Sequence, residues 1–469
     1  MTLFSGTKGF VIGAASSGTG KTTIASAICG ILRERGLEVQ PFKTGPDFVD
    51  PTYLTMASGR TCRSLDGFPC PDLMPFFYEE GCRPRGRKRA DVAVVEGVMG
   101  LYDGLGADGL YSTAWLARTL GLPVVLTVDA RAAATSVAAT VKGFATLDPL
   151  APRVAGVIAN RVSSLGHAEL IGEALAKFTG IPLLGWMPNI KDDGFRSRHL
   201  GLVPAPELSN SRSSMERFTD ILREHLDVSK LLSIMGEPSG NYASPEFPQG
   251  VKKRDGSRVR IALADDDAFC FHYRENWELL EQLGASVETV SPMRDKSLPE
   301  GTDLLVLPGG YPEEFSDELS DNKNFMASVT DFSRVGCVYA ECGGMLYLAD
   351  SMEYKNSLRS MCGVIRSDVK MTSRLEHFGY VEGTASRDNL LMKRGDTLRA
   401  HEFHYSKMVG TPPDAFSVVK ASRRDENWTD GFVMEDGRLL ATYLHINFYM
   451  NPKMAASMLA RAASPVNGR

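Results

Sequence analysis

The sequence of 469 residues lacks several features that would place it in a class at once. It contains no run of about 18 uninterrupted apolar residues, so we expect no membrane-spanning helix. Its first residues, MTLFSGTKGFVIG, lack the apolar core of a secretory signal. The net charge is only −5, which does not favour a nucleic-acid-binding protein. The eight cysteines lack the paired spacing of a zinc site or a disulfide framework, so we expect reduced thiols in a cytoplasmic protein.

What is present is an ordinary globular composition, with 43% apolar and 23% charged residues. Short β-branched runs alternate with helical patterns in the first part of the chain, which predicts a doubly wound α/β sheet. A helical pattern and a segment rich in Gly, Pro and Ser follow, and a second α/β alternation then begins. We therefore predict a first α/β domain over 1–205, a helical segment and linker over 206–257, and a second α/β domain over 258–469.

A glycine-rich segment, GAASSGTGKTT at 13–23, follows the first predicted strand and opens a helix. Its glycines would let backbone N–H groups face phosphate oxygens, and Lys21 would bring a positive charge to the β and γ phosphates. Ala15 stands where the strict P-loop pattern has glycine, and a plain Gly/Ser turn would also fit. The strand–loop–helix context favours phosphate binding. We predict an ATP site formed by Gly18, Gly20, Lys21, Thr22 and Thr23.

Two further loops, FKTGPDFVDP at 42–51 and VVEGVMGLYDG at 94–104, follow predicted strands and carry charged residues. Ligands of open α/β sheets bind beyond the carboxyl ends of the strands, so we expect these residues to converge with Lys21. Acidic groups beside a triphosphate would bind Mg²⁺ or orient the reactants, although turn chemistry also explains one such loop. We predict Mg²⁺ ligands at Thr22, Asp47 and Glu96, and groups that position the substrate or phosphate at Lys43, Asp50 and Asp103.

Two residues bear on the kind of ATPase. Asn160 ends the predicted strand GVIANRV at 156–162, where its amide would read an adenine edge or serve as a turn residue. Partition-type ATPases carry a second lysine five residues before the main one, and this chain has Ser16 there. The loop at 42–51 instead resembles that of dethiobiotin synthetase, an enzyme that activates a carboxylate.

Cys342 follows the predicted buried strand VGCVYA at 335–340 and precedes two glycines. MLYLADSM at 345–352 then has helical spacing. The cysteine is either a buried core residue or a nucleophile on a strand–helix turn, and the local pattern alone leaves both open. The ATP site favours the nucleophile, because an activated carboxylate needs an attacking group and a cysteine can release ammonia from glutamine.

A glutaminase cysteine needs a base and an oxyanion hole. His445 ends the strand that we predict in LLATYLHINFYMN at 439–451, and we assign it as the base. The loop VLPGGYPEEF at 306–315 supplies two glycines next to the nucleophile strand. We predict oxyanion-hole N–H groups at Gly309, Gly310 and Gly343.

Seven segments together resemble the cobyrinate a,c-diamide synthase family, and the resemblance covers nearly the whole chain. In chain order they are SSGTGKTT, KTGPDFVDP, EGVMGLYDG, LPGGYPE, AECGGMLYL, HEFHYS and YLHINF. The resemblance implies a P-loop NTPase domain like dethiobiotin synthetase and a C-terminal class I (triad) glutamine amidotransferase-like α/β domain. It implies a ligase in cobalamin biosynthesis that amidates the a and c carboxylates of cobyrinate, a corrinoid, through an acyl phosphate. Its partners would be ATP, Mg²⁺, L-glutamine and the corrinoid, with no nucleic acid or membrane; a homodimer stays open.

The chain departs from the wider amidotransferase pattern at two positions. Ala340 replaces the first glycine of G-x-C-x-G, and Asn447 stands where a glutamate follows the catalytic histidine by two residues. The cobyrinate-type branch lacks that third member, so the resemblance implies a Cys342–His445 dyad. Glu341 is adjacent to the nucleophile, but strand alternation predicts that it points to the opposite side. The group that orients His445 is therefore left open.

The segment LRAHEFHYSKM at 398–408 places His401, Glu402 and His404 close together. It lacks the helical H-E-x-x-H spacing, and its alternation predicts a strand, so we favour packing or substrate contact over metal binding. A polycarboxylate substrate needs cations, although a solvated basic loop explains the candidates equally well. The candidates are Lys43, Arg196 and Arg198.

Several alternative functions remain. The same chemistry could act on hydrogenobyrinate or nickel sirohydrochlorin. Cobyric acid synthase, which amidates four other side chains, generally differs in the ATP loop and the KTGPD segment. A non-catalytic P-loop switch protein with a degenerate amidotransferase module would be expected to have lost Cys342 or His445, and both are present.

Overall fold

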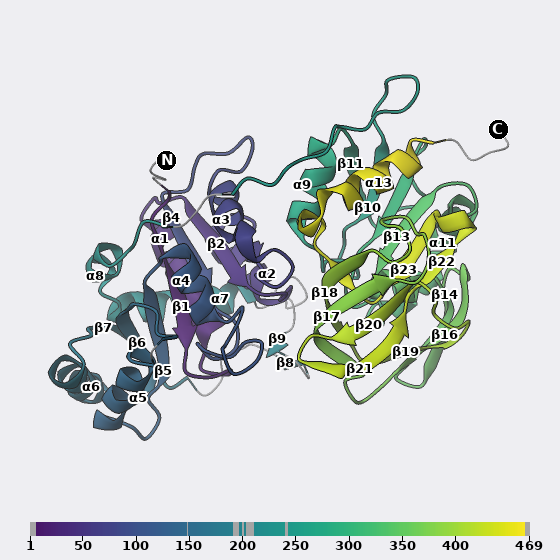
Figure 1. Cartoon of the computed structure of the whole chain (residues 1–469). Coiled ribbons are helices and arrows are strands. Elements are labelled where there is room, and N and C mark those ends of the chain that lie inside the picture. Colours follow the sequence, from purple (N-terminus) through teal and green to yellow (C-terminus); the bar gives the residue numbers. More distant parts are fainter. Residues whose placement is uncertain are drawn as a thin grey trace. The chain divides into compact units, whose positions relative to one another are not determined.

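The computed structural model describes residues 6–147, 149–190, 197–198, 201–202, 211–239 and 243–464. The chain divides into two compact units, Met1–Ser244 and Pro245–Arg469, which are coloured purple to teal and teal to yellow in Figure 1. The boundary falls inside the segment 206–257. Arg196 lies outside the described residues, so its predicted contact with substrate has no structural counterpart here. Within the described ranges, no helix is both long and apolar enough to cross a membrane.

The first unit is built on seven parallel strands. These are β1 (Gly9–Ala14), β2 (Val39–Thr44), β3 (Arg63–Leu65), β4 (Val92–Glu96), β5 (Val124–Asp129), β6 (Val154–Val162) and β7 (Leu183–Pro188). Their order in the sheet is β3-β2-β4-β1-β5-β6-β7. The central strands β1, β2 and β4 are buried along their whole length, as apolar runs covered on both faces should be. The predicted doubly wound α/β fold is confirmed.

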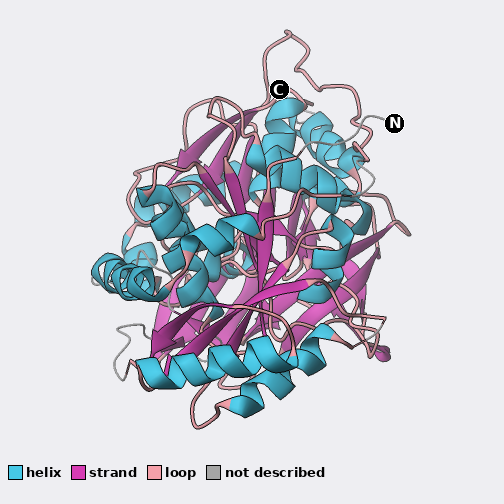
Figure 2. Ribbon diagram, turned by 90° about the vertical axis from the view of Figure 1, so that its left-hand side faces the viewer, coloured by secondary structure: helices cyan, strands magenta, loops and turns pink. Residues whose placement is uncertain are grey.

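Helices lie against this sheet (Figure 2). They are α1 (Lys21–Glu34), α2 (Asp50–Ser58), α3 (Met74–Cys82), α4 (Thr113–Leu120), α5 (Thr135–Ala145), α6 (Leu165–Phe178), α7 (Ser211–His225) and α8 (Val228–Ser233). Phe10 of β1 shares a core cluster with Ile28 of α1 and Leu222 of α7. On the opposite face, a Cβ on Gly9 would meet the Tyr78 hydroxyl of α3 at 2.5 Å. The two faces of the sheet are therefore covered by different helices. A separate small sheet pairs β8 (Ser197–Arg198) with β9 (Gly201–Leu202).

The second unit has a six-stranded sheet of its own. Its strands are β10 (Arg260–Ala264), β11 (Ser286–Val290), β12 (Leu304–Leu307), β13 (Cys337–Glu341), β22 (Phe432–Met434) and β23 (Leu439–Thr442). The order is β11-β10-β12-β13-β23-β22, parallel except for β22 at the edge. The helices of this unit are α9 (Arg274–Gln282), α10 (Ser316–Asp321), α11 (Lys323–Ser333), α12 (Gly343–Tyr347) and α13 (Pro452–Ala462).

Two further sheets complete this unit. One contains β14 (Ala349–Tyr354), β15 (Ser357–Ser360), β16 (Ile365–Met371) and β19 (Ser406–Gly410). The other contains β17 (His377–Ala385), β18 (Thr397–His404), β20 (Phe416–Lys420), β21 (Arg423–Asp430) and β24 (His445–Ile446). The strand predicted in LRAHEFHYSKM is confirmed as β18. The single strand predicted at 439–451 is wrong, because β23 and β24 belong to different sheets.

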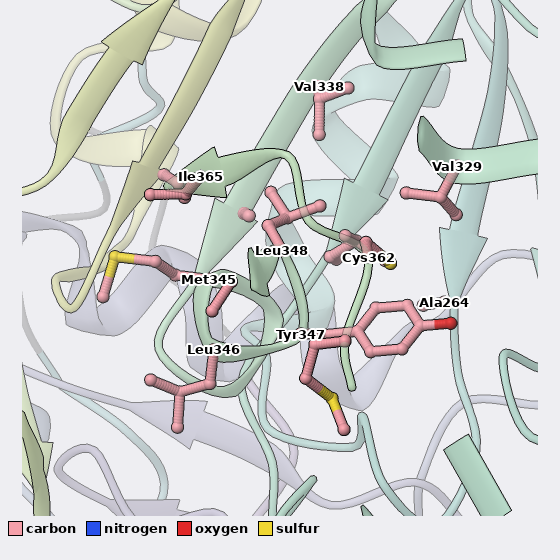
Figure 3. Close-up of a cluster of buried hydrophobic side chains, with 14 of the residues drawn as sticks. Ala264, Val329, Val338, Met345, Leu346, Tyr347, Leu348, Cys362 and Ile365 are labelled. Atoms are coloured by element: carbon pink, nitrogen blue, oxygen red, sulfur yellow. The ribbon is translucent and has the colours of Figure 1, made fainter. Parts of the chain in front are cut away.

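The helix predicted over 345–352 is also wrong. The helix α12 ends at Tyr347, and β14 begins at Ala349. Leu348 and Met352 are fully buried, and β14 pairs with β16, so burial in a sheet outweighs the helical spacing of this segment. Figure 3 shows Tyr347 and Leu348 among the buried side chains of this core.

Candidate active sites

The glycine-rich segment 13–23 forms the turn between β1 and α1. Gly18 and Gly20 have φ angles of 75° and 92°, in the left-handed region that glycine adopts without strain. Gly20 immediately precedes α1, whose first residue is Lys21. The N-terminus of α1 therefore opens at this loop, where its N–H groups and dipole favour a phosphate.

A buried lysine on β2 holds three carboxylates together. The Nζ atom of Lys43 lies 2.5 Å from Oδ2 of Asp50, 3.0 Å from Oε1 of Glu96 and 3.5 Å from Oδ2 of Asp47. The side chains of Lys43 and Glu96 are 2% and 0% exposed. Burial alone would lower the pKa of Lys43, but the three carboxylates raise it well above its usual value. Three of the carboxylates predicted at the strand ends thus meet around one cation.

Glu96 links this group to the glycine-rich loop. Its Oε1 accepts hydrogen bonds from the Thr22 hydroxyl at 2.7 Å and from Lys43 at 3.0 Å. Its Oε2 is buried and has no hydrogen-bond partner among the described residues. Burial raises the pKa of Glu96 to about 7, and Lys43 opposes that rise. A hydroxyl beside an unsatisfied carboxylate oxygen is a donor set that fits Mg²⁺.

The structure shows no larger metal-binding cluster. In the part of the chain that it describes, no group of three His, Cys, Asp or Glu side chains could hold a metal ion. Mg²⁺ in nucleotide sites usually takes only one or two carboxylates and completes its shell with phosphate oxygens and water. The donor set at Thr22 and Glu96 is therefore of the right size for a nucleotide-bound ion.

Lys21 and Asp103, two more of the predicted residues, have contacts of other kinds. The Nζ atom of Lys21 donates to the Met99 carbonyl at 2.6 Å, and burial followed by repulsion from Lys43 lowers the pKa of Lys21. Lys21 is thus close to the Lys43 group. Asp103 is exposed, and its Oδ2 accepts a hydrogen bond from the Gly100 N–H at 2.9 Å, which closes a turn in its own loop. This hydrogen bond stabilises a turn, and the role of Asp103 in positioning substrate or phosphate stays a prediction.

The end of β6 fastens the glycine-rich loop from the other side. Asn160 donates from Nδ2 to the Thr19 carbonyl at 2.7 Å, while its predicted contact with adenine stays a prediction. Arg161 donates to Oδ2 of Asp129 at 2.6 Å and to the Gly18 carbonyl at 2.8 Å, from a backbone φ of 61°. The sequence reasoning missed Arg161. Its position next to Asn160 at a strand end was the signal that could have identified it.

In the second unit, Cys342 lies between β13 and α12 with φ 43° and ψ −108°. Such a conformation is strained for a residue with a side chain, and strand–helix turns of this kind present nucleophiles. Its N–H donates to the Thr442 carbonyl at 2.7 Å. Cys342 is 8% exposed and belongs to the core cluster of this unit. Burial alone therefore does not separate the two interpretations of this cysteine, and its neighbours must do so.

The contact with His445 favours the interpretation of Cys342 as a nucleophile. The His445 ring hydrogen-bonds to Cys342, whose Sγ also lies 3.9 Å from the Phe403 carbonyl oxygen. Burial would lower the pKa of His445, but its contacts with Cys342 and Glu341 raise it to about 10. The ring is therefore protonated at neutral pH. The structure brings the predicted nucleophile and base together.

The predicted orientation of Glu341 is wrong. Its Oε2 lies 3.7 Å from Nδ1 of His445, and the side chain is almost fully buried. Side chains alternate only along an extended strand, and β13 ends at Glu341. The chain turns at Cys342, so the thiol and the carboxylate both reach His445.

Of the three predicted oxyanion donors, Gly309 is already engaged. Its N–H donates to the Phe271 carbonyl at 3.2 Å, and its own carbonyl accepts from the Phe271 N–H at 2.9 Å. A Cβ on Gly309 would meet Cε1 of His445 at 2.5 Å, so this glycine leaves room for the ring. A Cβ on Gly343 would lie 2.9 Å from the Gly310 nitrogen, which places these two backbones side by side. The remaining candidates for the oxyanion hole are the N–H groups of Gly310 and Gly343.

The HEFHYS segment lies next to Cys342. His404 contacts Oε1 of Glu402 and the Ser406 carbonyl, each at 2.8 Å, and its ring stacks on Tyr443. Burial lowers the pKa of His404 to about 4. The main chain of this strand supplies the Phe403 carbonyl near Cys342. A backbone contact of this kind leaves no signal in the sequence.

Comparison with known proteins gives matches over both units. A model of the CobQ/CobB/MinD/ParA nucleotide binding domain matches residues 10–198, and a model of the CobB/CobQ-like glutamine amidotransferase domain matches residues 260–453. A protein named cobyrinate a,c-diamide synthase from Listeria monocytogenes serotype 4b is 40% identical over 450 residues, which are 94% of this chain and 96% of that protein. A protein of the same name from Salmonella typhimurium is 39% identical over 463 residues, 97% of this chain and 98% of that protein.

Proposed function

Because the chain belongs to the cobyrinate a,c-diamide synthase family, we propose that it amidates the a and c carboxylates of cobyrinate in cobalamin biosynthesis, with ATP as the energy source and glutamine as the nitrogen donor. The enzyme class is a glutamine-dependent carbon–nitrogen ligase. Its two half-reactions have one site each, and each site uses a different buried cation.

The first half-reaction takes place at the glycine-rich loop. The γ-phosphoryl group of ATP passes to a carboxylate oxygen of the corrinoid, which gives an acyl phosphate and ADP. Lys21 and the N-terminus of α1 neutralise phosphate charge, and Lys43 holds Asp50 and Glu96 in position beside the phosphates. Thr22 and Glu96 would hold Mg²⁺, which neutralises the phosphate oxygens when bound.

The second half-reaction takes place at Cys342. The thiolate attacks the side-chain carbonyl of glutamine, and the N–H groups of Gly310 and Gly343 bind the oxyanion. Protonated His445 gives its proton to the leaving ammonia, and water then releases glutamate from the thioester. The ammonia attacks the acyl phosphate and expels phosphate, which completes one amide. A second cycle yields the diamide.

The single observation that carries this proposal is the assembled pair of Cys342 and His445 in a chain that also holds Lys43 and Glu96 against a glycine-rich loop. A non-catalytic P-loop switch protein has no use for a protonated histidine buried against a thiol. The eight free cysteines support a reducing, cytoplasmic environment for the enzyme.

The test is a side-by-side assay with cobyrinate, hydrogenobyrinate and nickel sirohydrochlorin, each with ATP, Mg²⁺ and glutamine. We expect cobyrinate to give a diamide by mass spectrometry, together with two ADP and two glutamate per product. A higher rate with either other macrocycle would reassign the substrate within the same chemistry. Four further amides on cobyrinate a,c-diamide would instead indicate cobyric acid synthase, and no macrocycle-dependent ADP would overturn the ligase proposal.

A further inference from the structure

We propose that Glu341, the residue immediately before the nucleophile, is the acid that orients His445. This inference rests on the proposed glutaminase function of Cys342. It gives the site a third member where the sequence pattern indicates only a cysteine and a histidine. The position that would carry the acid in the wider amidotransferase pattern is Asn447, and its side chain accepts a hydrogen bond from the Tyr449 N–H at 3.0 Å, which caps a turn.

The first observation is the geometry of the contact. The Oε2 atom of Glu341 lies 3.7 Å from Nδ1 of His445, and the two side chains are 2% and 3% exposed. The ring also hydrogen-bonds to Cys342, so the imidazole lies between a carboxylate and a thiol. Catalytic hydrogen bonds are often long before substrate binds and shorten in the complex.

The second observation is that the other oxygen of Glu341 is already fixed. Its Oε1 accepts hydrogen bonds from the Tyr339 hydroxyl and from the Ile446 N–H, the latter at 3.1 Å. Ile446 follows His445 in the short strand β24. The carboxylate therefore holds both the backbone and the ring of the same strand, and only Oε2 remains to face the imidazole.

Electrostatics agree with this arrangement. A buried carboxylate is costly unless a cation pairs with it, and His445 supplies that cation because Cys342 and Glu341 together raise its pKa to about 10. His401 is the cross-strand neighbour of His445, and burial lowers its pKa to about 3, so that ring is neutral. Glu402 is buried in the same strand as His401, and its pKa is raised to about 7.

His404 completes the set of titratable groups near the ring. Burial lowers its pKa to about 4, and its Nε2 lies 2.8 Å from Oε1 of Glu402. Glu341 lies 3.7 Å from Nδ1 of the His445 ring, and Glu402 interacts electrostatically with the same ring. A substitution at Glu341 should change the titration of His445 more than one at Glu402.

The decisive comparison is between Glu341→Gln and Glu341→Asp. Glutamine keeps the size of the side chain, but its oxygen would stay with Tyr339 and Ile446, so its amide NH₂ would face Nδ1 of His445. That contact favours the neutral ring and the wrong tautomer. We expect glutamine hydrolysis to fall by about 100-fold or more. Aspartate is shorter but keeps the charge, so we expect it to retain more activity than glutamine.

The pH profile separates positioning from a merely structural role. The carboxylate stabilises the imidazolium, so its loss lowers the pKa of His445 and moves the alkaline limb of kcat/KM for glutamine to lower pH. We expect a displacement of at least about one pH unit in Glu341→Gln and a smaller one in Glu341→Asp. Glu275→Gln, at another buried glutamate of this unit, should leave the limb in place. Synthesis from free ammonia should continue in all three variants.

An unmoved alkaline limb in Glu341→Gln, or more activity with glutamine than with aspartate, overturns the inference. If Glu341→Gln does not fold, iodoacetamide alkylation of Cys342 in the wild-type enzyme decides. Alkylation that is already fast at neutral pH and changes only near pH 10 supports an acid-stabilised imidazolium. A change near the ordinary histidine pKa of about 6.5, or a rate that simply rises with an ordinary thiol pKa of about 8.5, overturns it. If the wild-type enzyme hydrolyses no glutamine, the proposed function fails, and the alkylation profile still tests the Glu341–His445 contact.

Discussion

The two sites each place a buried cation beside the reacting group, but they neutralise it differently. In the first unit, Lys43 is surrounded by three carboxylates, which come from the loop after β2, the start of α2 and the end of β4. In the second unit, His445 contacts one carboxylate, Glu341, and one thiol. The first cation is a permanent charge in a shared network, whereas the second is a proton that can leave during the reaction.

This difference suits the two reactions. Phosphoryl transfer changes little at the protein except the distribution of negative charge, so a fixed network of charges stabilises it. In the proposed mechanism, ammonia release requires a proton to move from His445, and the two close neighbours of His445 set the charge of its ring. Since each unit holds its own cation, we expect substitutions in one unit to spare the half-reaction of the other.

The largest effect is expected from Cys342→Ala. Without the thiol no glutamine can be hydrolysed, so glutamine-dependent synthesis should fall to background, while synthesis from free ammonia should stay near the wild-type rate. Cys337→Ala, at another buried cysteine in the adjacent strand β13, should keep both reactions. Product analysis by mass spectrometry with each nitrogen source measures this. Loss of ammonia-dependent synthesis in Cys342→Ala would mean that the two units do not divide the chemistry.

Lys21→Ala and Glu96→Ala should produce the converse result. Lys21 neutralises transferring phosphate and Glu96 is the buried link between Thr22 and Lys43, so synthesis should fall by about 100-fold or more with either nitrogen source. The alkylation rate of Cys342 by iodoacetamide should not change, because that site has its own cation. ADP release and alkylation are measured on the same preparations. Near-normal turnover in either variant would place ATP elsewhere.

A smaller and graded effect is expected at the three aspartates. Asp50 is closest to Lys43, Asp47 is further away, and Asp103 is exposed and closes a turn. We therefore expect the loss of turnover to decrease in the order Asp50→Asn, Asp47→Asn, Asp103→Asn, from about 100-fold downwards. At least one variant should accumulate monoamide, since the corrinoid must rebind for the second amide. Normal rates and product ratios in all three would make these carboxylates turn residues.

The comparison also explains what the sequence could reveal. Lys43, Asp47, Asp50 and Glu96 were predictable because they follow or end parallel strands, and the sheet itself brings such positions to one edge. In the second unit, the nucleophile and His445 were predictable for the same reason. The strand–turn–helix pattern identified Cys342, and both domain types were found.

Other features depend on backbone torsions or main-chain partners that a sequence does not display. Glu341 was misplaced because alternation was applied up to Cys342, whose φ of 43° ends the strand. Gly309 looked like an oxyanion donor, but its N–H is bound by Phe271 from a distant loop. The helix predicted over 345–352 failed because pairing with β16 decides that segment.

The smallest effect on activity is expected from a substitution of Arg161, for which Arg131 offers a matched control. Arg161 donates a hydrogen bond to the Gly18 carbonyl of the glycine-rich loop. In the other unit, the Ile446 N–H similarly donates to Glu341. Arg161→Met removes the bond to Gly18 and the pair with Asp129. Hydrogen bonds of this kind contribute about 1 kcal/mol each, so we expect KM for ATP to rise by about 3- to 30-fold with little change in kcat.

Arg131 pairs with the same aspartate but is 61% exposed, so Arg131→Met is the matched control and should leave KM unchanged. Initial rates of ADP release over a range of ATP concentrations measure both. An equal rise in the two variants would show that Asp129 alone matters, and no rise in either would mean that the loop keeps its shape without the Arg161 contact.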